Sequence, residues 1–321
     1  MTDISADVAS ARTRPAFHGA MGELFGIHIV NILLGIVTIG IYRFWAKTRI
    51  RRYMWGRTSF LDDRFEYSGT GKELFLGFLI VLAILLPFGA VYFGLYVWLI
   101  QETPENADLV QIPYFIVIVF LVGAAIFRAR RYRLSRTLWR GIRGAQSGST
   151  MTFAGKYLGY LMLTIITLGW FTPFQNVKLA SYLFNNTYVG DRRFRFEGRG
   201  GDLIKAFAIN WILFIPTLGI SWFWYRAAEL RYFAAHTRYE DLSFESRVRG
   251  GPLAWLVISN FLIQVFTLSI AYPVVLVRSI RFICDNLEIV GEQDFAAIAQ
   301  STAAVPGRGE GLAEAFDVGG I

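Results

Sequence analysis

Long apolar runs separated by short basic segments dominate the chain. Stretches of about 19 residues or more without Lys, Arg, Asp or Glu cover 24–42, 74–101, 109–127, 157–177, 206–225 and 250–277. A helix needs about 20 apolar residues to cross a bilayer. Backbone polar groups find no water in lipid, so helix is the expected state of each run. The pattern predicts an all-α polytopic membrane protein.

A short motif recurs at the ends of the apolar runs. Thr-Leu-Gly or a close variant begins at Thr38, Thr167, Thr217 and Thr267, and the last three copies stand 50 residues apart. Gly and a nearby Pro interrupt helices, so each copy is expected to be a turn. The turn residues are Thr38, Gly40, Thr167, Gly169, Thr217, Gly219 and Thr267.

Matching residues follow each turn at fixed distances. An aromatic residue lies seven positions after the Thr in three copies, as Trp45, Phe174 and Trp224, and a glycine lies 33 positions after it, as Gly71, Gly200 and Gly250. Identities at several offsets indicate duplicated structural units. The fold class that follows is a membrane bundle of tandem helix-turn-helix repeats of about 50 residues.

Small β-hairpins are expected between these repeats. Segments 58–67, 187–196 and 237–246 alternate apolar and polar residues around a short turn that holds an aspartate. Such alternation is typical of a strand pair. The aligned aspartates Asp62, Asp191 and Asp241 could be ion ligands, but aspartate is a common turn residue and we favour that interpretation. The predicted hairpins lie at the cytoplasmic surface.

The charges suggest an orientation in the membrane. The formal net charge is +8, and the segments 43–73 and 128–156 are rich in Lys and Arg, whereas 101–111 has none and carries acids. Lys and Arg in short loops stay in the cytoplasm. We therefore expect 43–73 and 128–156 to be cytoplasmic and 101–111 to face outward.

Two arrangements of the other runs remain open. If each run crosses once, near-identical units are inverted relative to each other and basic segments fall on both faces. If each unit is instead a helical hairpin that enters and returns, all basic segments stay on one side. Residues 201–216 would make a helix of about 24 Å, shorter than the ~30 Å hydrocarbon core, so such hairpins would thin the bilayer or stop partway.

The segments after the turns mix aromatic residues with cations, which suits the headgroup layer. Anionic lipids attract such cations with about 1 kcal/mol each. A second interpretation starts from the equivalent positions of Arg49, Lys178 and Arg278, and from Arg226 near Glu229. In a hairpin these charges would lie near the middle of the bilayer, where they would need one another or a water-filled cavity. They are therefore candidates for a polar path or for contacts with lipid headgroups.

The sequence shows no pattern that indicates a disulfide, a metal site, a catalytic site or a nucleotide-binding site. The single Cys284 excludes an internal disulfide and a cysteine-based metal site, and the three histidines show no ligand spacing. The glycines near Gly69 and Gly198 lack the spacing of a phosphate-binding loop. No enzyme, cofactor or metal is expected, and fixed basic segments between spans do not indicate nucleic-acid binding. Residues 1–20 are expected to be a polar N-terminal tail, 21–290 the repeat-built membrane domain and 291–321 a flexible C-terminal tail.

The order of these motifs resembles the bacterial YjgN-like inner-membrane proteins, a family of unknown function. The resemblance covers roughly residues 17–290 and is carried best by 41–69 and 222–244. Residues 128–156 depart most, because they keep the arginines but lose the Phe-x-Phe strand. The resemblance implies a multi-pass protein of the bacterial inner membrane and carries over no catalytic residue.

Two functions fit the sequence. One is a transporter or channel with a polar path lined by the repeated cations, since transporters are often built from internal repeats. The alternative is a non-transport membrane scaffold or lipid-binding protein, with anionic headgroups as the expected partners. The oligomeric state is left open.

Overall fold

The computed structural model describes residues 12–292, 295, 298 and 300. In this part of the chain, pairs of helices alternate with pairs of short strands. The helical elements are α1 (Met21–Val37), α2 (Arg43–Gly56), α3 (Gly71–Glu102), η1 (Pro104–Val110), α4 (Gln111–Arg136), α5 (Thr150–Ile166), α6 (Thr172–Phe184), η2 (Gly200–Leu203), α7 (Ile204–Phe214), α8 (Trp222–Ala235), α9 (Gly250–Phe266) and α10 (Tyr272–Asn286). The strands are β1 (Arg12–Thr13), β2 (Ala16–Phe17), β3 (Thr58–Phe60), β4 (Asp63–Tyr67), β5 (Thr137–Trp139), β6 (Ile142–Gln146), β7 (Thr187–Val189), β8 (Arg192–Phe196), β9 (Thr237–Tyr239), β10 (Leu242–Ser246) and β11 (Leu287–Val290).

The strands join into one sheet whose two ends meet. Their order is β1-β11-β10-β9-β8-β7-β6-β5-β4-β3-β2, and every recorded pairing is antiparallel. The strands at the two ends, β1 and β2, are separated by Arg14 and Pro15 alone. The N-terminal segment therefore pairs with β11 on one side and with β3 on the other, which closes the strand order into a ring.

The expectation of an all-α fold is therefore wrong. The small β-hairpins that were expected between the repeats are also not separate from one another. Each pairs with the next strand along the chain, β4 with β5, β6 with β7, β8 with β9 and β10 with β11. Residues 128–156, expected to lose the strand, contain β5 and β6. Strands of two to five residues carry little periodic signal, and pairing between units brings together segments that lie far apart in the sequence.

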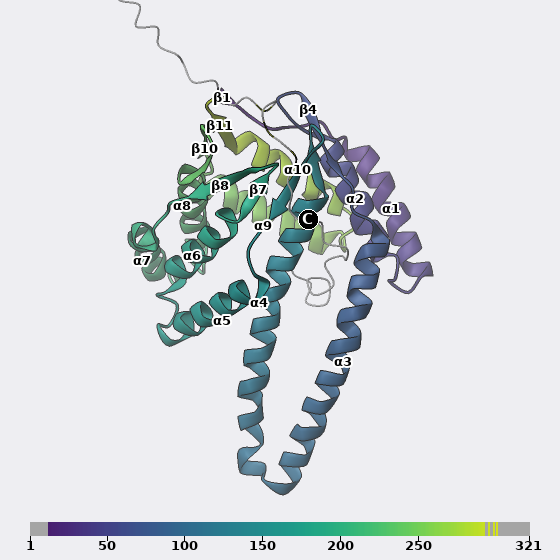
Figure 1. Cartoon of the computed structure of the whole chain (residues 1–321), viewed down its shortest axis with the longest axis vertical. Helices are drawn as coiled ribbons and strands as arrows, with labels where there is room; N and C mark the ends of the chain where they lie inside the picture. The colour runs from purple at the N-terminus through teal and green to yellow at the C-terminus, as the bar shows by residue number, and fades with distance from the viewer. Residues whose placement is uncertain (1–11, 293–294, 296–297, 299, 301–321) are drawn as a thin grey trace, which may run out of the picture.

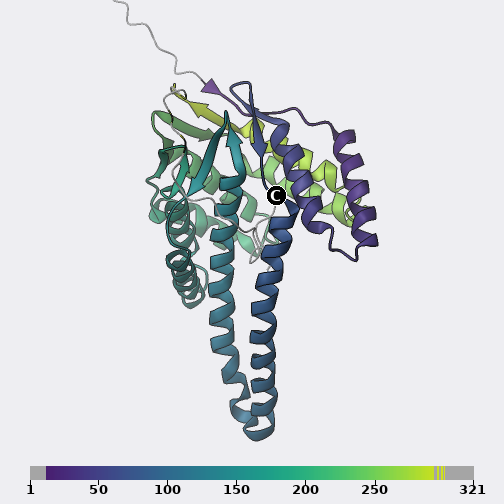
Figure 2. The ribbon, with the colours of Figure 1, turned by 45° about the vertical axis from the view of Figure 1, so that its right-hand side comes forward.

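The number of candidate spans is also smaller than the six apolar runs of the sequence suggest. Two helical segments of the described residues are long and apolar enough to cross a membrane, Gly71–Glu102 and Pro104–Arg136. Figure 1 shows α3 and α4 extending far beyond the rest of the molecule, and Figure 2 shows the same after a turn of 45° about the vertical axis. Helices α1 and α9 have 17 residues each, about 26 Å at 1.5 Å per residue. They are therefore shorter than the ~30 Å thickness of the hydrocarbon core.

The shorter helices fold back on one another in pairs, as the hairpin alternative describes. Helix α1 packs on α2, α5 on α6, α7 on α8 and α9 on α10, and α10 in turn packs on α1. Buried Leu24, Met54 and Val277 form the cluster that joins α1, α2 and α10. The first and last helices are thus neighbours, so the helices follow the same closed order as the strands.

An ion-pair cluster lies where the strand order closes. The Glu288 side chain is 3% exposed and accepts a hydrogen bond from Arg14 Nε at 2.8 Å, while Arg247 Nη2 lies 2.8 Å from its other oxygen. The cluster of Arg14, Arg247 and Glu288, which we call the seam, joins β10 and β11 to the N-terminal segment. The bond from Arg14, supported by the charge of Arg247, holds the pKa of Glu288 below its usual range.

Residues 1–20 were expected to be a polar N-terminal tail, but residues 12–17 contain β1 and β2 and belong to the sheet. Residues 1–11 of that tail, and most of the C-terminal tail from 293 onward, lie outside the described residues. The described Phe295 packs against Trp139 with ring centroids 4.8 Å apart.

Candidate functional site

The repeated threonine closes each helical turn through its hydroxyl group. Thr38 Oγ1 donates to the carbonyl of Leu34 at 2.7 Å and accepts from the N–H of Tyr42 at 2.9 Å. The same two bonds recur at Thr167, Thr217 and Thr267. The hydroxyl thus links a carbonyl at the end of one helix to an amide at the start of the next. The carbonyl also accepts from the backbone N–H of the threonine, so it is the amide that gains a partner it would otherwise lack.

The residue after each threonine is apolar and almost fully exposed. The exposed fractions are 93% for Ile39, 77% for Leu168, 92% for Leu218 and 86% for Leu268. We call these four the tip residues. Each has a φ near +50°, a conformation that is uncommon for a branched side chain. Apolar side chains fixed in this exposed position at four turns indicate a nonaqueous environment around the tips.

The long helices α3 and α4 meet at their far ends. Tyr92 stacks on Tyr114 with ring centroids 3.9 Å apart, and Phe88 stacks on the same Tyr114 ring. Between the helices, η1 carries Glu105 and Asp108. The acidic segment therefore lies at the end of the long hairpin that is farthest from the sheet (Figure 1).

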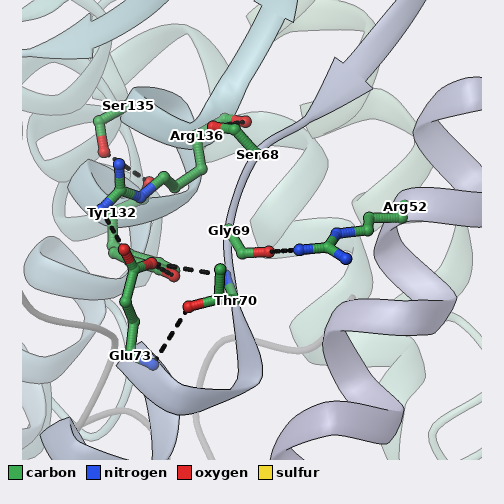
Figure 3. A network of polar contacts seen from close by, with 8 residues as sticks. All are labelled: Arg52, Ser68, Gly69, Thr70, Glu73, Tyr132, Ser135 and Arg136. Carbon is green, nitrogen blue, oxygen red and sulfur yellow. Dashed lines mark hydrogen bonds and ion pairs between the residues drawn. The ribbon is translucent and has the colours of Figure 1, made fainter.

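A polar network joins the other ends of these two helices (Figure 3). Thr70 and Glu73 form a capping box at the start of α3. The Glu73 carboxylate accepts hydrogen bonds from Tyr132 and Arg136 of α4, both at 2.6 Å. On the other side, Arg52 of α2 donates to the carbonyl of Gly69 at 2.8 Å. The base of the long hairpin is therefore fixed to the preceding helix pair.

The predicted path residues do not converge in the structure. Arg49, Lys178 and Arg226 are exposed, and Arg278 is half-buried. Lys178 lies 5.3 Å from the ring centroid of Tyr160, and Arg278 Nη2 donates to Ser259 at 2.7 Å. Each contact is made within one helix pair, and no recorded contact joins two of these four cations.

Among the residues predicted to line a polar path, Glu229 is the one that is fully buried. It is 0% exposed, pairs with Arg226, and accepts a hydrogen bond from Asn176 of α6 at 2.7 Å. It therefore links α8 to the preceding helix pair. Its neighbour Tyr225 is also buried, and the site is a structural contact between helices.

The space enclosed by the strands is apolar. Phe60, Trp139, Tyr239 and Ile289 form one buried cluster with side chains from most of the sheet, around a cavity of about 310 Å³. Burial, with the nearby Glu240 and Asp191 charges, raises the pKa of Tyr239 to about 12. The enclosed space offers no row of charges for a polar solute.

Three buried asparagines occupy equivalent positions of the repeats but were not among the residues predicted for the site. Asn31, Asn210 and Asn260 each lie seven residues before the turn threonine, and each is at most 7% exposed. The signal was present, because an amide at a fixed place in an apolar helix recurs three times. Asn210 accepts a hydrogen bond from Ser221 at 2.9 Å, and Asn260 donates to Ser279 at 3.2 Å. In Asn31 both the oxygen and the nitrogen of the amide have no partner.

Comparisons with known proteins point to one family. Residues 12–221 and 210–315 match the family DUF898, described as a bacterial protein of unknown function. The inner membrane protein YjgN of Escherichia coli O157:H7 is 22% identical over 239 residues, covering 64% of this chain and 57% of that protein. The protein of the same name from Salmonella typhimurium is 22% identical over 352 residues, covering 87% of this chain and 88% of that protein. The chain therefore spans little more than half the length of the Escherichia coli relative. No solved structure matches.

Proposed function

We propose that this chain, which belongs to the DUF898 family of bacterial proteins and is an integral protein of the inner membrane, binds anionic lipid headgroups. The proposal rests on the apolar tip residues, 77–93% exposed at the ends of helix pairs whose second helices carry cations. Apolar residues beyond a row of Lys and Arg are typical of elements that lie in one leaflet.

The proposed arrangement has two layers. Helices α3 and α4 cross the bilayer, with the acidic η1 outside, as the excess of Lys and Arg in the other segments favours. The four shorter helix pairs enter the cytoplasmic leaflet by their tips and leave the sheet in the cytoplasm. The length of α1 and α9, 17 residues each, supports this arrangement because they are too short to reach the far side.

Lipid binding is favoured over transport by the placement of the cations. A polar path needs charges that face one another or a wet cavity. Arg49 and Lys178 are exposed instead. The space inside the strands is lined mostly by aromatic and aliphatic side chains, and Arg130 is the one charged residue among the described residues that line it. Exposed cations at the membrane surface suit phosphate groups of anionic lipids.

The test reverses the three equivalent cations in the full-length protein, as Arg49→Glu, Lys178→Glu and Arg278→Glu together. Each cation near an anionic surface contributes about 1 kcal/mol, so binding of phosphatidylglycerol should weaken on the order of a hundredfold. Native mass spectrometry of the detergent-solubilised protein titrated with phosphatidylglycerol or phosphatidylcholine measures this.

A matched control reverses Arg64 and Arg193, exposed residues of β4 and β8 on the sheet, and should leave lipid binding unchanged. If the wild type binds both lipids equally, the proposal is wrong. Solute flux into proteoliposomes that is lost in the triple variant, with lipid binding intact, would favour the transporter instead.

A further inference from the structure

A cavity lined by cations lies at the base of the long hairpin, between α2 and the start of α3. Its volume is about 370 Å³. The cations Arg49 and Arg52 of α2 and Lys72 of α3 line it, with no Asp or Glu among its described lining residues. All three are exposed. A cavity lined by charges of one sign attracts ions of the opposite sign, so this one favours an anion.

Two of the cations make no contact that explains their presence. No hydrogen bond, ion pair or ring contact with another described residue is recorded for Arg49 or Lys72. Glu73 follows Lys72 in the chain, but its carboxylate already accepts hydrogen bonds from Tyr132 and Arg136. Lys72 is the second residue of α3, where the helix dipole disfavours a cation. Helix stability therefore does not explain this lysine, whereas a bound anion does.

Arg52 has a structural contact and still has donors to spare. It donates to the carbonyl of Gly69 at 2.8 Å, and Arg231 and Arg281 make the corresponding bond to the backbone in two other helix pairs. A guanidinium group has five N–H donors. One carbonyl leaves the charge of Arg52 and most of its donors available to a ligand.

The remaining wall of the cavity is aromatic. The rings of Tyr42 and Trp45 stack with centroids 6.3 Å apart, and both residues line the cavity. A Cβ added at Gly71 would lie 2.7 Å from Trp45, so α2 and α3 are in direct contact here. Trp and Tyr are enriched at the level of lipid headgroups. In the proposed arrangement the cavity lies where α3 enters the membrane.

No other repeat carries all three cations. They lie 11, 14 and 34 residues after Thr38. The second and third repeats have one cation each at these positions, since the residues there are Lys178, Ser181 and Gly201 after Thr167, and Ala228, Arg231 and Gly251 after Thr217. The last repeat has Arg278, Arg281 and Ser301 after Thr267. The complete set therefore belongs to the repeat next to the long hairpin.

We propose that this cavity binds an anion with two neighbouring phosphate groups, carried by a lipid headgroup such as that of diphosphatidylglycerol. The inference rests on the proposed function and names the lipid class that binds most selectively. One phosphate diester carries a single negative charge and would balance one of the three cations, whereas two phosphates balance Arg49 and Lys72 together. The volume lies within the range of about 300–1,000 Å³ that is typical of small-ligand sites, and it leaves room for more than one phosphate group.

The test compares the full-length wild type with the double variant Arg49→Gln/Lys72→Gln. The matched control, Lys156→Gln/Lys205→Gln, removes the same charge from exposed positions of α5 and α7. Native mass spectrometry with diphosphatidylglycerol, phosphatidylglycerol and phosphatidylcholine measures the dissociation constants. The wild type and the control should bind diphosphatidylglycerol about tenfold or more tightly than phosphatidylglycerol, and the cavity variant should lose most of this preference.

Thermal unfolding in detergent separates loss of the site from loss of the fold. The substituted side chains are exposed, so the cavity variant should unfold at the temperature of the wild type when no lipid is present. A ligand that binds the folded state raises this temperature. Diphosphatidylglycerol should therefore stabilise the wild type and the control more than it stabilises the cavity variant.

The outcomes separate this inference from the proposed function. The inference is wrong if the cavity variant keeps the preference for diphosphatidylglycerol, or if the control loses it equally. The proposed function then stands if the triple charge reversal still weakens the binding of phosphatidylglycerol. A wild type that binds phosphatidylglycerol and phosphatidylcholine equally overturns both.

Inorganic pyrophosphate distinguishes a soluble source of the two phosphates from a lipid. Pyrophosphate that binds the wild type but not the cavity variant, while both bind diphosphatidylglycerol alike, supports the two-phosphate chemistry and overturns the lipid source. Diphosphatidylglycerol binding that depends on Arg49 and Lys72, with no binding of pyrophosphate, supports the lipid.

Discussion

At the scale of single residues, the repeated positions are explained by contacts. Tyr53, Tyr182 and Tyr232 each accept a hydrogen bond from the N–H, and donate one to the carbonyl, of a residue 33 positions earlier. In these three helix pairs the tyrosine lies in the second helix, and its two bonds hold the residue that precedes the first helix. The corresponding residue of the last pair is Phe282, which has no hydroxyl to do so.

The repeated glycine has an equally local cause, which gives the first prediction. A Cβ added at Gly250 would lie 2.6 Å from the Trp224 ring, whereas one at the neighbouring Gly251 would meet nothing within 4 Å. Both lie in the first turn of α9. Gly250→Ala should therefore lower the free energy of unfolding by about 1–3 kcal/mol through overpacking.

Gly251→Ala is the matched control and should be neutral or slightly stabilising, because alanine favours a helix over glycine by about 0.5–1 kcal/mol. Chemical denaturation of both variants in detergent measures the difference. The pair Gly200→Ala and Gly201→Ala repeats the comparison, since only the first would contact Phe174. Equal stability within each pair would contradict the packing argument.

At the scale of elements, the sequence was informative where the signal is local. The turns at Thr38, Thr167, Thr217 and Thr267 follow from the motif alone, and so do the short strands around Asp191 and Asp241. Pairing between units could not be read, because β4 and β5 are separated by the whole long hairpin. Arg49, Lys178 and Arg278 occupy equivalent positions of their repeats, which suggested that their side chains meet at one site. Equivalent residues of units arranged in a ring can equally face outward, so equivalence alone does not predict a shared site.

The position of the helix tips gives the second prediction. In a Cys284→Ser background, a cysteine replacing Leu218 lies at a tip and one replacing the exposed Asp241 lies in a turn of the sheet. The thiolate is the reactive form, and an apolar environment disfavours it. In membrane vesicles, a charged maleimide should label the Asp241→Cys variant at least tenfold faster than the Leu218→Cys variant.

Labelling of both variants after denaturation in sodium dodecyl sulfate is the control for intrinsic reactivity and should be equal. Leu168→Cys should behave as Leu218→Cys does, because Leu168 is also a tip residue. Fast labelling at both tips in intact vesicles would show that they lie in water and would exclude the proposed contact with the leaflet.

At the scale of the whole molecule, closure is the property that the sequence concealed. Residues 12–17 looked like part of a polar tail, yet they supply the two strands that join the ends of the sheet. Two-residue strands carry no alternation to detect. Closure leaves β1 and β2 without a long free edge, which is how barrels avoid pairing with other chains. The chain therefore depends on contacts between its two ends.

The seam makes this closure sensitive to pH, which gives the third prediction. The pKa of Glu288 is lowered in the folded protein, first by the hydrogen bond from Arg14 and then by the charges of Arg14 and Arg247. A carboxyl group with a depressed folded pKa stabilises the fold above its unfolded pKa of about 4.3, and this stability is lost as the pH falls through the folded value. Glu288→Gln should therefore lower the thermal midpoint at pH 7 and reduce its decline below about pH 4.3. Thermal unfolding in detergent between pH 7 and pH 3 measures both, and Glu66→Gln, at an exposed position of β4, should follow the wild type throughout. Coincident curves for wild type and Glu288→Gln across this range would mean that the buried carboxylate contributes nothing to holding the two ends of the described chain together.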